Sequence, residues 1–370
     1  MDKAKCMTIV GNRPQFIKMA PVSHEIKRRG YSEFIIHTGQ HYDENMSDVF
    51  FEELEIPRPD INLDIHTGNH GSMTGEMLIK LEELMIKYKP GSLLIYGDTN
   101  STLAAALAAV KLHIPIAHVE AGPRIYDIDT PEEINRIVAD RSARFKFCPD
   151  IISVQNLAKE NITDGVYFTG DVMYDAYLHF SEIASEKSSI LEKYNINYKY
   201  ALLTVHRPNN TCDERVLNKI IDVVYNSDIK VVFVVHPRTE NAFIRYGLWK
   251  RLNACPNIVI IRAVGYLDMM KLLNSSQIVL TDSGGLQKEA FFAGIPTIIL
   301  FYATPWPQIM DAQWQKLCWN DGIDVQKVLQ LIKGYRPGTE RPQLFGDGNA
   351  AVKVVDVLEN NNWFGDGENC

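Results

Sequence analysis

The sequence lacks the long apolar run that a membrane-spanning helix requires, and its amino-terminus does not resemble a signal peptide. The apolar stretch Cys6–Val10 follows the polar start Met1–Lys5 and is far too short for either element. We therefore expect a cytoplasmic protein that does not insert into a membrane.

Paired cysteines and a basic character are also missing. The six cysteines are scattered, with no Cys-x-x-Cys pair and no Cys/His cluster, so the sequence indicates neither a metal site nor a disulfide framework. The formal net charge of −8 gives no general attraction for nucleic acid, although a local basic cleft could still bind an anionic ligand. The sequence also has no low-complexity tract and no solenoid repeat.

What the sequence does have is an alternation of short apolar runs and amphipathic stretches. A chain of 370 residues, of which 46% are hydrophobic, is long enough for two domains with separate cores. Buried strands that alternate with helices are typical of a parallel, doubly wound sheet. In the first series we predict strands at Cys6–Val10, Phe34–Thr38, Leu93–Tyr96, Ile114–Val119 and Phe145–Cys148, and helices at 14–29 and 100–112.

A polar region, residues 181–198, is predicted to link this series to a second one. We predict one Rossmann-like domain over 1–185, a second over 186–346, and a helix and tail over 347–370 that pack back on the first domain. In open α/β sheets, ligands bind beyond the carboxyl ends of the strands. The second series consists of strands at Tyr200–Val205, Lys230–Val235, Ile258–Ala263, Ile278–Thr281 and Pro296–Leu300, with a helix at 214–225.

The segment Gly11–Lys18 directly follows the first predicted strand. Pro14 suits the first turn of a helix, and N–H groups beside Arg13 and Lys18 make a natural site for an anion. An ordinary strand-to-helix turn with surface cations is the alternative. The segment lacks Gly-x-Gly-x-x-Gly, so dinucleotide binding is not supported.

Three acidic residues at neighbouring strand ends suggest proton-transfer chemistry. Asp98 opens a predicted helix, where it could be only a helix cap. Glu120 closes an apolar run, where an acid gains nothing from burial unless it is paired or functional. Glu132 lies four residues before Arg136, so a surface ion pair is the alternative to a catalytic role.

Two histidines in the second half, His206 and His236, each directly follow an apolar strand and have an arginine close by, Arg207 and Arg238. A lone histidine in such a place is more often structural than catalytic. Arginine grips phosphate with two hydrogen bonds and histidine titrates near neutral pH, so the two pairs favour a phosphorylated ligand.

The segment Thr281–Ala290 runs from a predicted strand through Ser283-Gly284-Gly285 into a helix. Glycine permits close approach of the backbone, and the amino-terminus of a helix can receive a diphosphate. Glu289, one turn later, could reach a ribose diol. A glycine turn that merely joins strand and helix is the alternative.

Taken together, these motifs resemble the non-hydrolysing UDP-N-acetylglucosamine 2-epimerase family. Each motif alone is weak, but the ordered set covers nearly the whole chain. The resemblance implies an α/β, GT-B-like fold, in which two Rossmann-like, doubly wound domains flank an inter-domain cleft that holds the active site. The motifs are Gly11–Pro21, Thr38–Tyr42, Gly97–Thr99, His118–Gly122, Pro131–Arg136, His206-Arg207, Thr281–Ala290 and Phe345–Gly348.

The resemblance implies a reaction in two stages, elimination of UDP across C1–C2 to a glycal and re-addition of UDP with protonation of C2 on the other face. It implies no nicotinamide or other cofactor, and a homodimer is a further expectation because the family is commonly dimeric. By position, Asp98, Glu120, Glu132 and His206 match the catalytic residues. Arg13, Lys18, Ser283, Gly284, Gly285 and Glu289 match positions that hold the nucleotide, and Gln40, Arg136, Arg207 and His236 are further predicted contacts with the UDP-sugar.

The chain departs from the common family pattern after the last strand of the second series. There the aromatic segment Phe301–Pro307 replaces an arginine- and glutamate-rich one, so an expected cationic contact is missing. Three features look more like the branch that acts on UDP-2,3-diacetamido-2,3-dideoxy-glucuronic acid. They are the Arg-Pro-Gln-Phe-Ile-Lys form of the first motif, residues 68–77, and Trp306. The Arg-Gln pair that some members use to bind an allosteric substrate molecule is not evident near His66–Met73, which predicts little substrate activation.

Three other functions stay open from the sequence. A GT-B glycosyltransferase would keep the fold but need an acceptor. A catalytically silent sugar-nucleotide-binding protein would account for Phe301–Pro307 where charged residues are expected. A hydrolysing relative would release N-acetylmannosamine and UDP, depending on whether water reaches the glycal.

Overall fold

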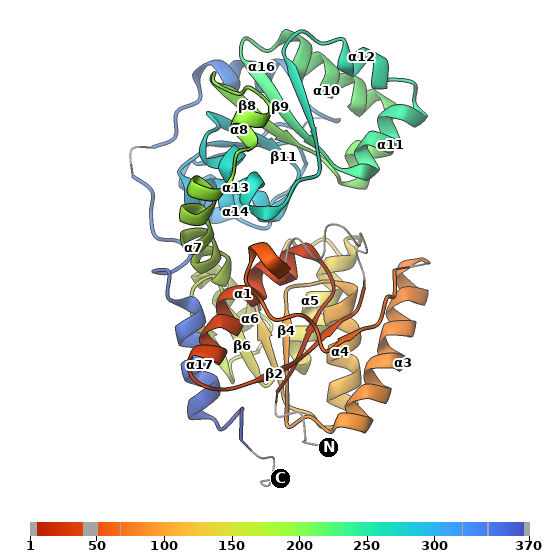
Figure 1. The fold of residues 1–370 in the computed structure, drawn as a ribbon, viewed down its shortest axis with the longest axis vertical. Coiled ribbons are helices and arrows are strands. Elements are labelled where there is room, and N and C mark those ends of the chain that lie inside the picture. Colours follow the sequence, from red (N-terminus) through yellow and green to blue (C-terminus); the bar gives the residue numbers. More distant parts are fainter. Residues whose placement is uncertain (1–5, 40–50, 67, 320, 339, 366–370) are drawn as a thin grey trace. The chain divides into compact units, whose positions relative to one another are not determined.

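The computed structural model describes residues 6–39, 51–66, 68–319, 321–338 and 340–365, drawn as a ribbon in Figure 1. Two compact units make up the chain. The first is Met1–Leu178 together with Gln343–Cys370, and the second is His179–Pro342. Each unit contains one parallel sheet whose strands alternate with helices along the chain.

The sheet of the first unit has the strand order β3-β2-β1-β4-β5-β6-β7, and all neighbouring strands are parallel. This is a doubly wound order that changes direction between β1 and β4. Every residue of β1, β4, β5 and β6 is buried, which explains their continuous apolar sequences. The strands are β1 (Cys6–Val10), β2 (Glu33–His37), β3 (Ile61–Asn62), β4 (Ser92–Tyr96), β5 (Ile116–Val119), β6 (Phe145–Cys148) and β7 (Val166–Phe168).

The helices of the first unit begin at side chains that cap them. Asn12 accepts a hydrogen bond from the backbone N–H of Gln15 at the start of α1, and Thr99 and Asp150 cap α4 and α6 in the same way. The alanine-rich α4 contacts both α3 and the strands β1, β4 and β5, which its small side chains permit. The helices are α1 (Arg13–Arg28), α3 (His70–Tyr88), α4 (Asn100–Lys111), α5 (Pro131–Ser142), α6 (Ile151–Lys159), the first part of α7 (Val172–Lys187) and α17 (Ala350–Asn360).

The sheet of the second unit has the order β10-β9-β8-β11-β12-β13, again all parallel, and changes direction between β8 and β11. Its core packs apolar residues of α10 and α16 against the central strands. The strands are β8 (Tyr200–Thr204), β9 (Lys230–Val235), β10 (Ile258–Arg262), β11 (Ile278–Thr281), β12 (Thr297–Ile299) and β13 (Gln315–Leu317). The helices are α8 (Ile190–Lys193), α9 (Pro208–Thr211), α10 (Glu214–Asn226), α11 (Pro237–Arg245), α12 (Trp249–Asn253), α13 (Tyr266–Asn274), α14 (Gly284–Ala293), α15 (Pro307–Asp311) and α16 (Val325–Gly334).

The predicted strands and helices of both series are confirmed, with ends that shift by up to about two residues. The polar region 181–198 differs from the linker that its sequence suggests, because the end of α7 and all of α8 occupy much of it. The two units divide between Leu178 and His179, inside α7. Glu182, Glu186 and Lys187 are good helix formers, so the lack of a strand pattern there did not mean a lack of structure.

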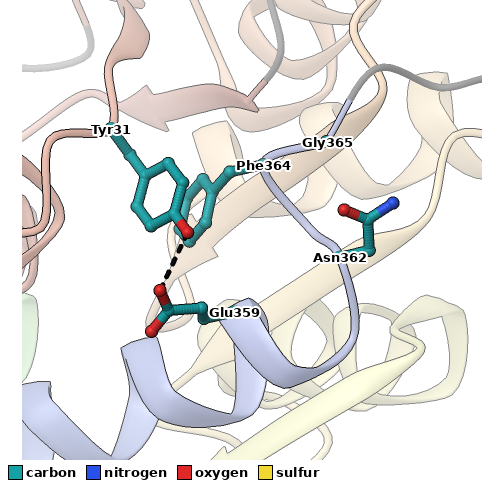
Figure 2. A pocket seen from close by; sticks show the side chains of 5 residues that line it. All are labelled: Tyr31, Glu359, Asn362, Phe364 and Gly365. Atoms are coloured by element: carbon teal, nitrogen blue, oxygen red, sulfur yellow. Dashed lines mark hydrogen bonds between the residues drawn. The ribbon is translucent and has the colours of Figure 1, made fainter.

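The last helix, α17, returns to the first unit and packs beside α1 (Figure 1). Arg29 at the end of α1 pairs with Asp356 and Glu359 of α17, each at 2.6 Å. Figure 2 shows how the ring of Tyr31 stacks on Phe364, with centroids 4.5 Å apart, while its hydroxyl donates to Glu359 at 2.8 Å. A small cavity of about 80 Å³ lies beside them at this helix junction.

Candidate functional site

Three candidate residues of the first unit, Arg13, Asp98 and Glu120, follow the carboxyl ends of β1, β4 and β5. This edge includes the point between β1 and β4 where the strand order reverses, the usual ligand site of a doubly wound sheet. Because Tyr96 of β4 pairs with Val119 of β5, the turns that follow these strands start side by side. Asp98 and Glu120, one in each turn, are therefore brought to the same edge.

Glu120 is held by a buried ion pair with Lys18 of α1. Oε1 of Glu120 lies 2.6 Å from Nζ of Lys18, and the side chains are 9% and 8% exposed. Glu120 adopts a left-handed φ of 69°, a conformation that is costly for a residue with a side chain and that clusters at functional sites. A Cβ on Gly97 would lie 2.9 Å from Nζ of Lys18, so the turn after β4 borders this pair closely.

Asp98 pairs with Arg136 of α5, and its backbone carbonyl accepts a hydrogen bond of 2.9 Å from the Asn135 side chain. The Arg136 guanidinium also donates to Glu133 at 2.6 Å. Burial alone would lower the pKa of Arg136, but Asp98 and Glu133 raise it above its ordinary value. Arg136 is therefore firmly charged and fixes the position of Asp98.

The helical ion pair with Arg136 is made by Glu133, three residues away, rather than by Glu132. Glu133 is buried and also accepts a hydrogen bond of 2.9 Å from the backbone N–H of Tyr126, so it holds the loop before α5. Glu132 is exposed. Helical spacing allows either acid to pair with Arg136, and only burial separates them.

Gln15, the glutamine in the Arg-Pro-Gln form of the first motif, has a structural role. Its side-chain amide donates to the Tyr96 carbonyl at 2.8 Å and accepts from the Gly11 N–H at 2.7 Å, so it joins the ends of β1 and β4. Arg13 is half-buried at the start of α1. Gln40, the remaining predicted contact of this unit, lies outside the described residues.

In the second unit, the buried carboxylate of Asp282 organises the ends of β8 and β11. It accepts hydrogen bonds from the backbone N–H groups of His206 and Arg207, at 3.0 and 2.9 Å, and from the Asn210 side chain at 2.7 Å. Nδ1 of His206 also lies 3.3 Å from its Oδ1. Asp282, which the sequence did not single out, therefore fixes the backbone and ring of the predicted catalytic histidine.

The rings of His206 and His236 lie 5.8 Å apart, so the two predicted histidines share one site. His236 caps α11, where its Nδ1 accepts a hydrogen bond from the backbone N–H of Arg238. The Arg207 guanidinium lies 4.5 Å from the ring centroid of Phe301, which orients it by a cation–π contact. Imidazole and guanidinium groups therefore gather at the ends of β8 and β9.

Ser283 caps α14, and Gly284 and Gly285 form the first turn of that helix. A Cβ on Gly284 would meet its described neighbours at 3.4 Å or more, an ordinary contact, so packing of the unit does not require glycine here. Trp306 donates from Nε1 to the Gly284 carbonyl at 2.9 Å and lies over the buried Lys288, whose Nζ is 4.3 Å from a Trp306 ring centroid. Glu289 is buried one turn along the helix.

Two other kinds of site are not found within the part of the chain that the structure describes. No group of His, Cys, Asp and Glu side chains there could hold a metal ion. No helix in the same residues combines the length and apolar character needed to cross a membrane.

Comparisons with known proteins match almost the whole chain. The family model for UDP-N-acetylglucosamine 2-epimerase matches residues 24–359. A UDP-N-acetylglucosamine 2-epimerase homolog of Methanococcus maripaludis is 47% identical over 96% of this chain and 99% of its own. The UDP-2,3-diacetamido-2,3-dideoxy-D-glucuronate 2-epimerase of Pseudomonas aeruginosa is 42% identical over the same shares.

Solved structures agree with these relatives. The crystal structure of the Methanocaldococcus jannaschii UDP-GlcNAc 2-epimerase in complex with UDP-GlcNAc and UDP has a TM-score of 0.90 and 35% identity, and the match covers 96% of this chain and 99% of the other. The Neisseria meningitidis enzyme bound to UDP-GlcNAc has a TM-score of 0.86 and 29% identity over 96% and 100%. With these folds and motifs in common, the chain belongs to the UDP-N-acetylglucosamine 2-epimerase family of isomerases and has its GT-B-like fold.

Proposed function

We propose that the protein inverts C2 of a UDP-activated 2-acetamido sugar without hydrolysing it. UDP leaves across C1–C2 to give a glycal, and returns as C2 is protonated on the opposite face. UDP-N-acetylglucosamine is the reference substrate, because it is the one named for most of the similar relatives. In this proposal the first unit moves protons, and the second holds UDP.

The observation that carries the proposal is the pair of carboxylates after β4 and β5, each held by a cation. The carboxylate of Glu120 contacts Lys18 and that of Asp98 contacts Arg136. Removal of the weakly acidic proton at C2 needs a positioned base, and protonation from the other face needs a second acid–base group. Two acids supported from different helices can serve the two faces, and His206 and the exposed Glu132 are the further candidates for proton transfer.

The start of α14 supports the assignment of UDP to the second unit. The backbone N–H groups of its first turn can bind a diphosphate, and Gly284 leaves them open to close approach, a reason for glycine that packing does not supply. His206, Arg207 and His236 add donors that stabilise the charge on departing UDP. We assign Glu289 to the ribose.

A uronic-acid substrate is the second candidate, because Trp306 looks more like the branch that acts on such sugars. Trp306 and Phe301 cover Lys288 and Arg207 by cation–π contacts. A relative at 42% identity is named for UDP-2,3-diacetamido-2,3-dideoxy-D-glucuronate. The test of C2 inversion therefore has to include both sugars, because they differ in their substituents.

The test is incubation with UDP-N-acetylglucosamine, or with UDP-2,3-diacetamido-2,3-dideoxy-glucuronate, in heavy water without any acceptor. We expect deuterium at C2 and a manno product with one of them, and no exchange with the Asp98→Asn variant. A need for an acceptor, or no exchange with either sugar, would contradict the proposal. Accumulation of the free manno sugar with UDP would instead identify a hydrolysing enzyme. The cytoplasmic location and the homodimer stay predictions from the sequence.

A further inference from the structure

His118 of β5 is completely buried, and both nitrogens of its ring face acceptors. Nδ1 lies 2.8 Å from Oδ1 of Asp140 on α5, and Nε2 lies 2.7 Å from the backbone carbonyl oxygen of Gly97. A carbonyl oxygen has no hydrogen to donate, so Nε2 must carry one. If Asp140 is ionised, Nδ1 must carry one as well, and the ring is then an imidazolium.

The surroundings of Asp140 match an ionised carboxylate. Its Oδ2 lies 2.7 Å from a guanidinium nitrogen of Arg124 and 3.2 Å from the donating N–H of Gly122. Complete burial alone would raise the pKa of Asp140, but the His118 ring and the Arg124 guanidinium hold it below its ordinary value. Oδ2 therefore accepts from two donors, which suits an ionised carboxylate better than a protonated acid.

We propose that His118 is a positioning residue, a buried imidazolium that clamps the Gly97 carbonyl to Asp140 and so fixes the turn that carries Asp98 against the turn that carries Glu120. Gly97 directly precedes Asp98 and also donates its N–H to the Val119 carbonyl at 2.9 Å. Asp140 holds the second turn at the N–H of Gly122. The kinetic part of the inference rests on the proposed function, and the charge of the ring does not.

Charged groups of both signs surround His118. Lys146 of β6 is its register partner in the neighbouring strand and donates from Nζ to the Asp164 carbonyl at 2.8 Å. Glu160, at the end of α6, pairs with Arg124 at 2.6 Å. An imidazolium close to the acid-bearing turns stabilises negative charge there. The titratable groups on the elements that pack around this pair are Asp140, Arg124, Lys146, Glu160, the Cys148 thiol, and, on the turns and α1, Asp98, Glu120 and Lys18.

The charge is tested directly by nitrogen NMR of the full chain with labelled histidine. We expect both ring nitrogens of His118 to carry protons at neutral pH, with the signal assigned by its loss in His118→Asn. His37 is the internal contrast, because burial lowers the pKa of its ring. Asp140→Asn should remove the second proton of His118. An unprotonated ring nitrogen in the wild-type protein at neutral pH would overturn the proposal.

The positioning role is tested by kinetics of C2 exchange. We expect His118→Asn to lower kcat by about 10²-fold with little change in KM, and to move the acidic limb of the kcat/KM profile to higher pH. Met85→Ala, a core change near the carboxyl end of α3, is the control for lost stability and should keep the wild-type kcat and profile. Should His118→Asn not fold, Asp140→Asn carries the same comparison.

The outcomes separate the two proposals. A folded His118→Asn with wild-type kcat and pH profile refutes the positioning role, whatever the charge of the ring. A wild-type protein that exchanges no C2 hydrogen refutes the proposed function, while a doubly protonated His118 would still support the buried imidazolium.

Discussion

The ion pair between Lys18 and Glu120 offers the sharpest test of the proton-transfer site. We predict that Glu120→Gln lowers kcat by about 10²–10⁴-fold, the usual contribution of a positioned acid or base. UDP affinity should change little, because glutamine keeps the shape of the side chain and an acceptor for Lys18. Lys18→Met should lower both kcat and stability, because it leaves the buried carboxylate without this cation.

The magnitude follows from the geometry. Two charges 2.6 Å apart attract by about 6 kcal/mol at an effective dielectric constant of about 20, and desolvation of two side chains that are 8% and 9% exposed offsets much of this. Removal of one partner of a buried pair costs about 3–5 kcal/mol. We therefore expect Lys18→Met to cost that much, Glu120→Gln about 1–3 kcal/mol, and the pair to show a coupling free energy of about 1–3 kcal/mol.

The free energy of unfolding can be measured for each unit because the tryptophans are divided between the two units. Trp363 is the single tryptophan of the first unit, and Trp249, Trp306, Trp314 and Trp319 all belong to the second. Fluorine NMR of fluorotryptophan-labelled protein in urea therefore reports the unfolding of each unit separately, which a two-domain chain requires.

Two results would refute the reasoning about this pair. A coupling free energy below about 0.5 kcal/mol would mean that Lys18 does not hold Glu120. Wild-type C2 exchange in Glu120→Gln would remove Glu120 from the proton-transfer step.

Three further predictions concern single positions. Asp282→Asn should destabilise the second unit by about 2–4 kcal/mol, because an amide group would face the N–H donors of the turn after β8. Calorimetry should also show weaker UDP binding. Unchanged stability and affinity would contradict the role of Asp282. Burial raises the pKa of Asp175 from 3.8 to about 6, although two N–H groups of α17 oppose the shift. Between these pH values the folded state holds more protons than the unfolded state. The stability of the wild-type protein relative to Asp175→Asn should therefore fall by up to about 3 kcal/mol as pH rises through this window. Urea unfolding at several pH values measures this difference, and an increase in relative stability with pH would refute the prediction. Gly97→Ala should lower the free energy of unfolding by about 1–3 kcal/mol, measured by thermal unfolding, and should lower kcat. The reason is that φ of Gly97 is +62° and the new Cβ would lie 2.9 Å from the Lys18 ammonium. Unchanged stability and kcat would mean that the turn can relax.

Most strands could be predicted because they are apolar runs between polar turns. The edge strands β3, β7 and β13 were not predicted, since they are short and include exposed or half-buried residues such as Asn62, Phe168 and Lys316. Local hydrophobicity does not reveal a strand of this kind, because pairing to one neighbour is enough to form it.

The acids of α5 show the limit of helical spacing. Residues three and four positions apart lie on the same helix face, so Glu132 and Glu133 were both compatible with a pair to Arg136. Glu133 makes the pair because the loop before α5 lies over it and donates to it through the backbone N–H groups of Ile125 and Tyr126. That loop contact depends on tertiary packing.

The sequence by itself determined the two βα series, the strand ends at which Asp98, Glu120 and His206 lie, and the family to which these motifs belong. These properties are local, because burial period, turn residues and motif order are all written along the chain. Tertiary structure alone decided the partners, such as Asp282 for His206 and the pairing of His118 with Asp140 and Gly97. The physical reason is that a hydrogen bond needs two groups within about 3 Å, and strand order brings together residues that lie far apart along the chain.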